Sequence, residues 1–206
     1  MYHRPMDGTL RDVAAFILAG GKSTRMGAEK AFLVLNGRTL LARALELARS
    51  VTADVRIVGE AAKFAAFAPV VEDVFRECGP LGGIHAALRA SWADLNLILA
   101  VDLPFVPPAL LPLLITRARG SPAKVTVARA GGGFQPLCAV YRRAFTDLAE
   151  KALREGRYKI DALFDEAQTQ VIGEDELEAA GFPASVFRNL NTREELAAAS
   201  EIGDSR

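Results

Sequence analysis

The hydrophobic positions of this chain switch repeatedly between continuous apolar runs and a helical spacing. Residues 13–19 and 95–101 are uninterrupted apolar runs, as in strands that are buried on both faces of a sheet. Residues 38–49 instead place five apolar side chains on one face of a helix. Shorter patterns predict strands at 55–58 and 69–73 and helices at 61–67, 84–90 and 109–117. This alternation predicts an α/β domain with a mostly parallel sheet and helices on both faces.

The pattern changes after residue 120. Residues 124–128 and 135–141 flank a triple glycine at 131–133, which predicts a small β excursion resembling a hairpin. Further along we expect helices at 144–155 and 160–168, a strand at 186–189, and a last helix that opens on the capping box at 192–195. The interpretation is a flexible N-terminal tail, residues 1–12, followed by one domain, residues 13–206.

Composition narrows the possible functions. The 206 residues include 25 Lys plus Arg and 25 Asp plus Glu, so the net charge is zero and a broad basic nucleic-acid surface is disfavoured. Two cysteines cannot form a disulfide scaffold or a four-cysteine zinc site, and two histidines leave little for a histidine-based metal site. The longest apolar run, 95–101, is too short to cross a bilayer. With no secretory signal pattern at the N-terminus, we expect a cytoplasmic protein with no nucleic-acid or membrane partner.

The loop after the first strand carries candidate chemistry, because ligands of open α/β sheets bind beyond the carboxyl ends of the strands. Gly20 and Gly21 let successive N–H groups turn toward an anion, and Arg25 and Lys30 add two cations, so the loop can hold a triphosphate. The segment fits neither a Walker A loop, which would need a glycine where Phe16 stands, nor the dinucleotide-binding glycine pattern. A tight turn with solvated basic residues is the alternative.

Two acidic residues end predicted strands. Asp73 follows the third strand and Asp102 the central one, where Leu103-Pro104 makes a stiff turn. A carboxylate at this edge suits Mg²⁺, which binds one or two carboxylates together with phosphate oxygens. Each Asp could instead only cap a turn. Taken with the glycine loop, the two acids predict a metal–nucleotide site.

The order of these motifs resembles a known family. The segment LAGGKSTRMGAEK, residues 18–30, is similar to the signature loop of small-molecule nucleotidyltransferases. Similar motifs follow in the same order: Glu72-Asp73, Gly79-Pro80-Leu81-Gly82-Gly83, Asp102-Leu103-Pro104-Phe105, Gln135-Pro136-Leu137 and Asn189-Leu190-Asn191-Thr192. Together they resemble the molybdenum cofactor guanylyltransferase family over residues 13–198. The resemblance implies a single doubly wound, Rossmann-like nucleotidyltransferase domain that uses Mg²⁺ and transfers GMP from GTP to molybdopterin, releasing pyrophosphate.

The resemblance also implies roles for individual residues. On the nucleotide side it places Leu18, Ala19 and Gly20 at the guanine and its nucleoside, Arg25 and Lys30 at the triphosphate, Gly21 and Asp73 at the nucleotide, and Asp102 at the nucleotide and Mg²⁺. Arg25, Lys30 and Asp102 would serve catalysis. On the acceptor side it places Gly82, Gln135, Pro136, Arg157, Lys159, Asn189 and Asn191. Contacts with cofactor-synthesis proteins or molybdoenzyme chaperones would be transient.

The chain departs from the family pattern at three places. Thr24 stands where an arginine is usual, Glu29 where an aspartate is common, and Val58-Gly59-Glu60 where members can carry an asparagine contact. Two alternatives stay open. A cytidylyltransferase or another small-molecule nucleotidyltransferase of the same fold is one, although Gly20-Gly21 favours guanine. A non-catalytic nucleotide or cofactor carrier is the other, although the retained basic residues and Asp102 favour an enzyme.

Overall fold

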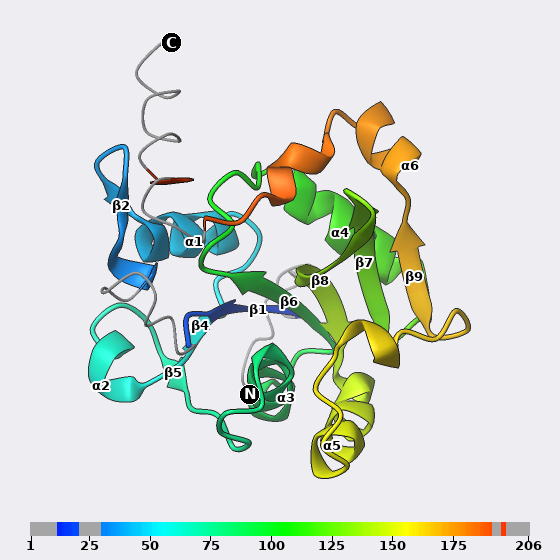
Figure 1. The fold of residues 1–206 in the computed structure, drawn as a ribbon, viewed down its shortest axis with the longest axis horizontal. Coiled ribbons are helices and arrows are strands. Elements are labelled where there is room, and N and C mark those ends of the chain that lie inside the picture. Colours follow the sequence, from blue (N-terminus) through cyan, green and yellow to red (C-terminus); the bar gives the residue numbers. More distant parts are fainter. Residues whose placement is uncertain (1–11, 21–29, 191–194, 197–206) are drawn as a thin grey trace, which may run out of the picture.

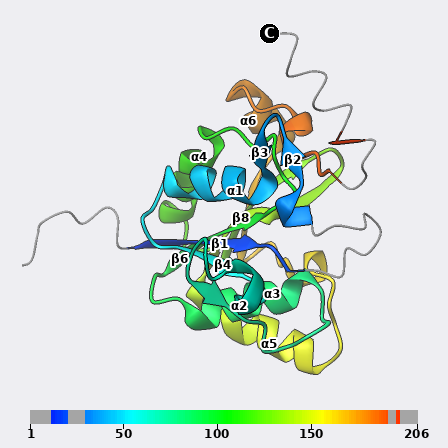
Figure 2. The same ribbon diagram turned by 90° about the vertical axis from the view of Figure 1, so that its left-hand side faces the viewer.

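A seven-stranded sheet lies between two layers of helices (Figures 1 and 2) in the computed structural model, which describes residues 12–20, 30–190 and 195–196. The strand order across the sheet is β5-β4-β1-β6-β8-β7-β9. The strands are β1 Val13–Leu18, β4 Val55–Val58, β5 Val70–Val71, β6 Leu95–Ala100, β7 Val125–Ala130, β8 Gly133–Arg142 and β9 Thr169–Ile172. Every residue of β1 and β6 is buried, as their continuous apolar runs predict.

Six of the seven strands run in the same direction. β4, β1 and β6 pair in parallel, as do β7 and β9, whereas β8 is antiparallel to both of its neighbours. The predicted mostly parallel sheet with a β excursion is therefore confirmed, and the excursion is the β7–β8 hairpin. Since Leu99 pairs with Cys138, the first residues of β8 extend beyond the end of β6. They reach the edge where the parallel strands end, here called the carboxyl edge.

Helices cover both faces of the sheet (Figure 2). One face carries α1 Leu40–Arg49, α4 Leu110–Arg119 and the short α6 Glu174–Ala179, and the other carries α3 Pro80–Ala90 and α5 Thr146–Arg154. The four-residue α2, Ala61–Phe64, lies beside β5. Each face has its own apolar core. α1 begins where Thr39 Oγ1 accepts a hydrogen bond from the Ala42 N–H at 3.1 Å, and its predicted apolar face is buried.

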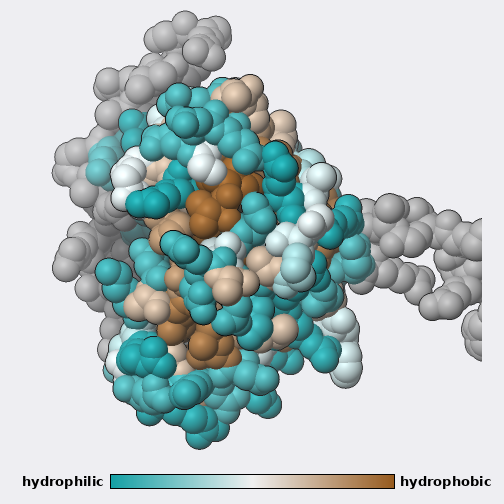
Figure 3. Space-filling model, turned by 90° about the vertical axis from the view of Figure 1, so that its right-hand side faces the viewer, coloured by the Kyte–Doolittle hydropathy of each residue, from teal (hydrophilic) through white to brown (hydrophobic). Residues whose placement is uncertain are grey.

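One margin of the sheet is open. β9 pairs with β7 alone, and Val171 on it is 37% exposed. Figure 3 looks at this side of the molecule, where apolar patches are surrounded by hydrophilic residues. Within the described part of the chain, no helix has both the length and the apolar character needed to cross a bilayer.

Three predicted elements differ from those in the structure. The helix expected at 84–90 begins at Pro80, because the positive φ of Gly79 and the fixed φ of Pro80 start it one turn earlier. The helix expected at 160–168 is only a 3-10 turn, Asp161–Leu163, which buries Ile160 and Leu163. The strand expected at 186–189 is a 3-10 turn as well, Ala184–Phe187, entered from Pro183.

Other elements were not predicted. β2, Val34–Leu35, and β3, Arg38–Thr39, form a hairpin whose turn residues Asn36 and Gly37 both have positive φ. β9 and α6 were also missed. Two more 3-10 turns, Lys30–Phe32 and Arg143–Phe145, complete the structure. Residues 1–11 of the expected tail, and 192–194 of the expected capping box, lie outside the described residues.

Candidate active site

The ends of β1 and β4 are held together at the carboxyl edge. The N–H groups of Ala19 and Gly20 both donate to the carbonyl of Val58, at 3.1 and 3.2 Å. Gly20 is exposed, whereas Leu18 and Ala19 are buried. Leu18, Ala19 and Gly20, which the resemblance assigns to the nucleoside, thus lie at the carboxyl edge. Gly21 and Arg25 fall outside the described residues.

Lys30 and Asp102 form the charged pair of this edge. Lys30 Nζ lies 2.9 Å from Asp102 Oδ2, and each side chain is 18% exposed. The two residues are 72 positions apart, and the fold brings them together because β1 and β6 are adjacent strands. The signature lysine and the acid after the central strand thus lie side by side.

Asp73 contributes a carboxylate oxygen without a partner. Its Oδ1 is buried and makes no hydrogen bond within the described residues, and burial raises the pKa of this carboxyl. The oxygen lies 3.7 Å from where a Cβ on Gly83 would stand, in the first turns of α3, and the Leu18 side chain borders the same point. A buried acceptor left unpaired is costly in the free protein, so a ligand N–H or O–H fits here.

The described residues contain no group of three or more His, Cys, Asp or Glu side chains suited to hold a metal by themselves. A single carboxylate is nonetheless enough for Mg²⁺ when phosphate oxygens and water complete its coordination. Asp102 is a partly accessible carboxylate of this kind, and Lys30 lies next to it.

The acceptor-side prediction draws on two further segments. The Leu190 N–H donates to the carbonyl of Asp102 at 3.1 Å, which brings the preceding residue, the exposed Asn189, close to Asp102. Gln135 Nε2 donates to the carbonyl of Ala130 across the hairpin, at 3.0 Å. The carbonyl of Pro136 accepts from the buried Tyr141 hydroxyl at 2.9 Å. These bonds stabilise the start of β8, while Asn191 lies outside the described residues.

Arg157 and Lys159 follow α5 and are both exposed. Arg157 Nε and Nη2 donate to Glu155 Oε2 at 2.9 and 2.6 Å, which orients its guanidinium. Interaction with the Cys78 thiol raises the pKa of Tyr158, which stands between the two cations. The basic segment thus borders the loop that precedes α3, at the same edge of the sheet.

Gly82 is buried in the first turn of α3. A Cβ there would lie 2.7 Å from the carbonyl oxygen of Phe75, closer than real contacts allow, so the residue must be glycine for the 73–79 loop to close. Phe75 in turn meets the buried His85 ring edge-on, with centroids 5.0 Å apart. Burial lowers the pKa of His85, which favours a neutral imidazole. Sequence reasoning gave Gly82 an acceptor role but missed this steric requirement.

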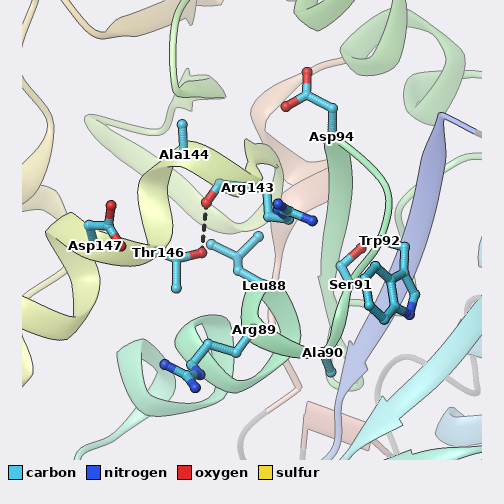
Figure 4. A pocket seen from close by; sticks show the side chains of 10 residues that line it. All are labelled: Leu88, Arg89, Ala90, Ser91, Trp92, Asp94, Arg143, Ala144, Thr146 and Asp147. Carbon is cyan, nitrogen blue, oxygen red and sulfur yellow. Dashed lines mark hydrogen bonds between the residues drawn. The ribbon is translucent and has the colours of Figure 1, made fainter.

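A separate hollow of about 800 Å³ lies at the opposite edge of the sheet (Figure 4). It separates the end of α3 from the start of α5, and Trp92 beside it is 87% exposed. Its lining comprises Leu88, Arg89, Ala90, Ser91, Trp92, Asp94, Arg143, Ala144, Thr146 and Asp147. None of the predicted site residues belongs to it, so the candidate site remains the carboxyl edge.

Comparison with known proteins identifies the family to which this chain is similar. Residues 15–171 match the family model described as the MobA-like NTP transferase domain. A molybdenum cofactor guanylyltransferase of Desulfosudis oleivorans is 35% identical over 187 residues, covering 89% of this chain and 92% of that protein. A probable molybdenum cofactor guanylyltransferase of Pelotomaculum thermopropionicum is 33% identical, covering 92% of each.

A solved structure gives the same picture. Molybdopterin-guanine dinucleotide biosynthesis protein A from Archaeoglobus fulgidus superposes with a TM-score of 0.81 at 26% identity, covering 94% of this chain and all of that one. A cytidylyl-type synthase from Anaerococcus prevotii, 4-diphosphocytidyl-2C-methyl-D-erythritol synthase, superposes with a TM-score of 0.70 at 13% identity. At that identity the likeness concerns the fold alone.

Proposed function

This chain belongs to the MobA-like NTP transferase family, and we propose from the residues at its carboxyl edge how it performs the family's reaction. As a molybdenum cofactor guanylyltransferase, it transfers GMP from GTP to the phosphate of molybdopterin and releases pyrophosphate. The observation that carries the assignment of roles is the Lys30–Asp102 pair, 2.9 Å apart, beside the Ala19–Gly20 strand end.

The reaction needs no covalent nucleophile from the protein. An oxygen of the acceptor phosphate attacks the α-phosphorus of GTP, a new P–O bond forms, and the bond to the leaving pyrophosphate breaks. The protein therefore contributes mainly positioning and charge neutralisation. Lys30 would face the triphosphate, and Asp102 holds its ammonium in place. We assign the same task to Arg25 from its place in the signature loop.

Mg²⁺ is the metal we propose, with Asp102 as its protein ligand. A bound Mg²⁺ would neutralise charge on the phosphates. The residues present fit such an ion, because Asp102 offers a hard oxygen donor with partial access to solvent. Asp73 would accept a hydrogen bond from the nucleotide through its unpaired Oδ1.

The acceptor would bind on the other side of Asp102. Asn189 and Gln135 offer uncharged amides, which suit the many donors and acceptors of a pterin better than a triphosphate. Arg157 and Lys159 offer positive charge for the acceptor phosphate. We place Gly82, Pro136 and Asn191 on this side as well. Handover of the product to proteins that assemble or chaperone molybdoenzymes would be transient.

The test measures thermal unfolding with GTP, CTP or ATP, each with and without Mg²⁺, and then pyrophosphate release with molybdopterin added. A ligand of the native state present at about 100 times its Kd stabilises the fold by about 2.7 kcal/mol. We expect GTP with Mg²⁺ to give the largest shift and to support turnover. An equal or larger shift with CTP would favour a cytidylyltransferase, and nucleotide binding without pyrophosphate release would favour a carrier.

A further inference from the structure

Two phenylalanine rings are stacked at the end of β4, close to the nucleotide side of the site. The rings of Phe32 and Phe64 have centroids 5.7 Å apart and planes inclined by 23°. Phe64 is 1% exposed, whereas Phe32 is 38% exposed and covers it from the solvent side. We call these two rings the aromatic stack. A third ring, Phe67, lies 5.8 Å from Phe32 and is 47% exposed.

The aromatic stack requires a glycine beneath it. A Cβ on Gly59 would lie 2.8 and 2.9 Å from two carbons of the Phe64 ring, and 3.6 Å from the N of Gly20. Any side chain at position 59 would therefore displace the Phe64 ring, while its distance from the Gly20 N would be an ordinary contact. The space that a side chain at position 59 would need is filled by the Phe64 ring.

The aromatic stack is linked to Lys30 through the backbone. Phe32 and Lys30 belong to the same 3-10 turn, Lys30–Phe32, which is closed by a bond from the Leu33 N–H to the Lys30 carbonyl at 3.1 Å. Ala31, between them, is fully buried in the core under α1. The turn is thus held from below by Ala31 and from the side by Phe32, and Lys30 extends from it to Asp102.

A lysine side chain is long and flexible, so its ammonium stays in one place only if its backbone is fixed or its charge is paired. When a triphosphate and Mg²⁺ approach Asp102, the pairing with that carboxylate is shared with new partners. The backbone position then decides whether the ammonium still reaches the reacting phosphates. A misplacement of about 1 Å in such a group can cost about a hundredfold in rate.

We infer that Phe32, seated on Phe64 and Gly59, is a positioning residue that fixes Lys30 for the triphosphate. This inference rests on the proposed function, because it takes the Lys30–Asp102 pair as part of the nucleotide site. Phe32 itself touches no substrate in this account. Its effect passes only through Lys30.

The test is a double-mutant cycle in the full-length chain with Phe32→Ala and Lys30→Gln, alone and combined. Isothermal titration with GTP and Mg²⁺ gives the Kd, and pyrophosphate release with molybdopterin gives kcat and KM. Phe32→Leu is the conservative variant. Phe67→Ala is the matched control, since it removes an exposed ring of the same cluster from a segment without site residues.

We expect Phe32→Ala to weaken GTP binding or turnover about tenfold, with the KM for molybdopterin unchanged within about twofold. Phe32→Leu should recover most of the loss, and Phe67→Ala should stay within about twofold of the parent protein. With Gln at position 30, Phe32→Ala should have almost no further effect on the Kd for GTP. The same factor in both backgrounds would overturn the inference, because Phe32 would then act independently of Lys30.

A second pair of variants tests the packing of Phe64 against Gly59. Gly59→Ala should reproduce the Phe32→Ala loss, and adding Phe64→Leu to it should restore binding by making room for the new methyl group. A Gly59→Ala protein with unchanged GTP affinity would also contradict the inference. Failure of the proposed function can be told apart from failure of this inference. If the proposed function were wrong, the parent protein would release no pyrophosphate, yet the coupling between Phe32 and Lys30 in GTP binding could still be measured.

Discussion

Gly82 and Gly83 are adjacent in α3 and offer a matched test of how the 73–79 loop is held. In Gly82→Ala the new methyl group would lie 2.7 Å from the carbonyl oxygen of Phe75, which is backbone and cannot rotate away. In Gly83→Ala it would lie 3.3 Å from Leu18 Cδ2, the end of a side chain that can adjust. The two substitutions add the same atoms to the same helix, one residue apart.

The expected magnitude follows from these distances. Ordinary contact begins at 3.4 Å, so Gly82→Ala forces a displacement of about 0.7 Å, and overpacking of this kind costs about 1–3 kcal/mol. Both variants gain up to about 1 kcal/mol of helix propensity. We therefore expect Gly82→Ala to be less stable than Gly83→Ala by about 2 kcal/mol, or about 4–8 °C in Tm.

Thermal and urea unfolding of the two variants and the parent protein would measure this difference. Because the displaced loop carries Asp73, the Gly82→Ala protein should also show weaker binding of GTP. Equal Tm values for the two variants would refute the reasoning, as would a Gly82→Ala protein more stable than Gly83→Ala. In either case the contact with the Phe75 carbonyl could not be what requires glycine at position 82.

Three further predictions concern side chains at the carboxyl edge. Asp102→Asn should fold normally yet lose nearly all turnover, since it removes the anionic partner of Lys30 at almost constant side-chain size. Circular dichroism would check the fold and pyrophosphate release would check turnover. Full activity of the variant would show that Asp102 is not the metal ligand. Asp73→Asn should raise the Tm of the nucleotide-free protein at neutral pH and reduce the Tm shift caused by GTP. Burial raises the pKa of Asp73 in the folded protein, so the protonated, neutral carboxyl is the form that the fold favours. Its contribution to the free energy of unfolding is fully present below the pKa of the unfolded state and is lost as pH rises through the pKa of the folded state. The higher Tm of Asp73→Asn should therefore disappear in acid, and a higher Tm that persists there would contradict this account. Asn189→Ala should weaken molybdopterin binding by about 1–3 kcal/mol in calorimetric titration and leave GTP affinity within about twofold, whereas equal losses for both ligands would mean that Asn189 only supports the fold.

The sequence was most informative where apolar runs are buried on both faces. β1 and β6 are fully buried along their length, so their patterns were continuous and their ends, including Asp102, could be located. The α1 face was equally clear because five of its residues are buried at helical spacing. They include the ends of β1 and β6, where we propose that the nucleotide binds.

The missed elements are those with few buried residues. β9 is an edge strand that buries only Ile172 fully, so its apolar pattern is too sparse to indicate a strand. The spacing of Ile160 and Leu163 fits a helix, but a single buried turn satisfies it. The β2–β3 hairpin could have been found, because Asn36-Gly37 is a strong signal for a two-residue turn.

Site contacts between distant segments were beyond sequence reasoning. Nothing local predicts that the Leu190 N–H binds the Asp102 carbonyl, or that Phe64 occupies the space above Gly59. Both depend on which loops meet once the sheet has formed. The resemblance to a family supplied the list of site residues, and only the coordinates show which of them touch.

The reversed direction of β8 has a consequence for how such proteins diverge. The proposed nucleotide half of the site lies at the last residues of β1 and β6, which pair with a neighbouring strand on each side. The proposed acceptor half includes the first residues of β8, next to the hairpin tip at Gly131 and Gly132, where an added side chain would find little or no obstruction. Insertions at that tip would lengthen the acceptor wall without shifting the register of β6. On this proposal, proteins with this fold can change which acceptor they bind by altering the β7–β8 hairpin alone, while the nucleotide side of the site stays the same.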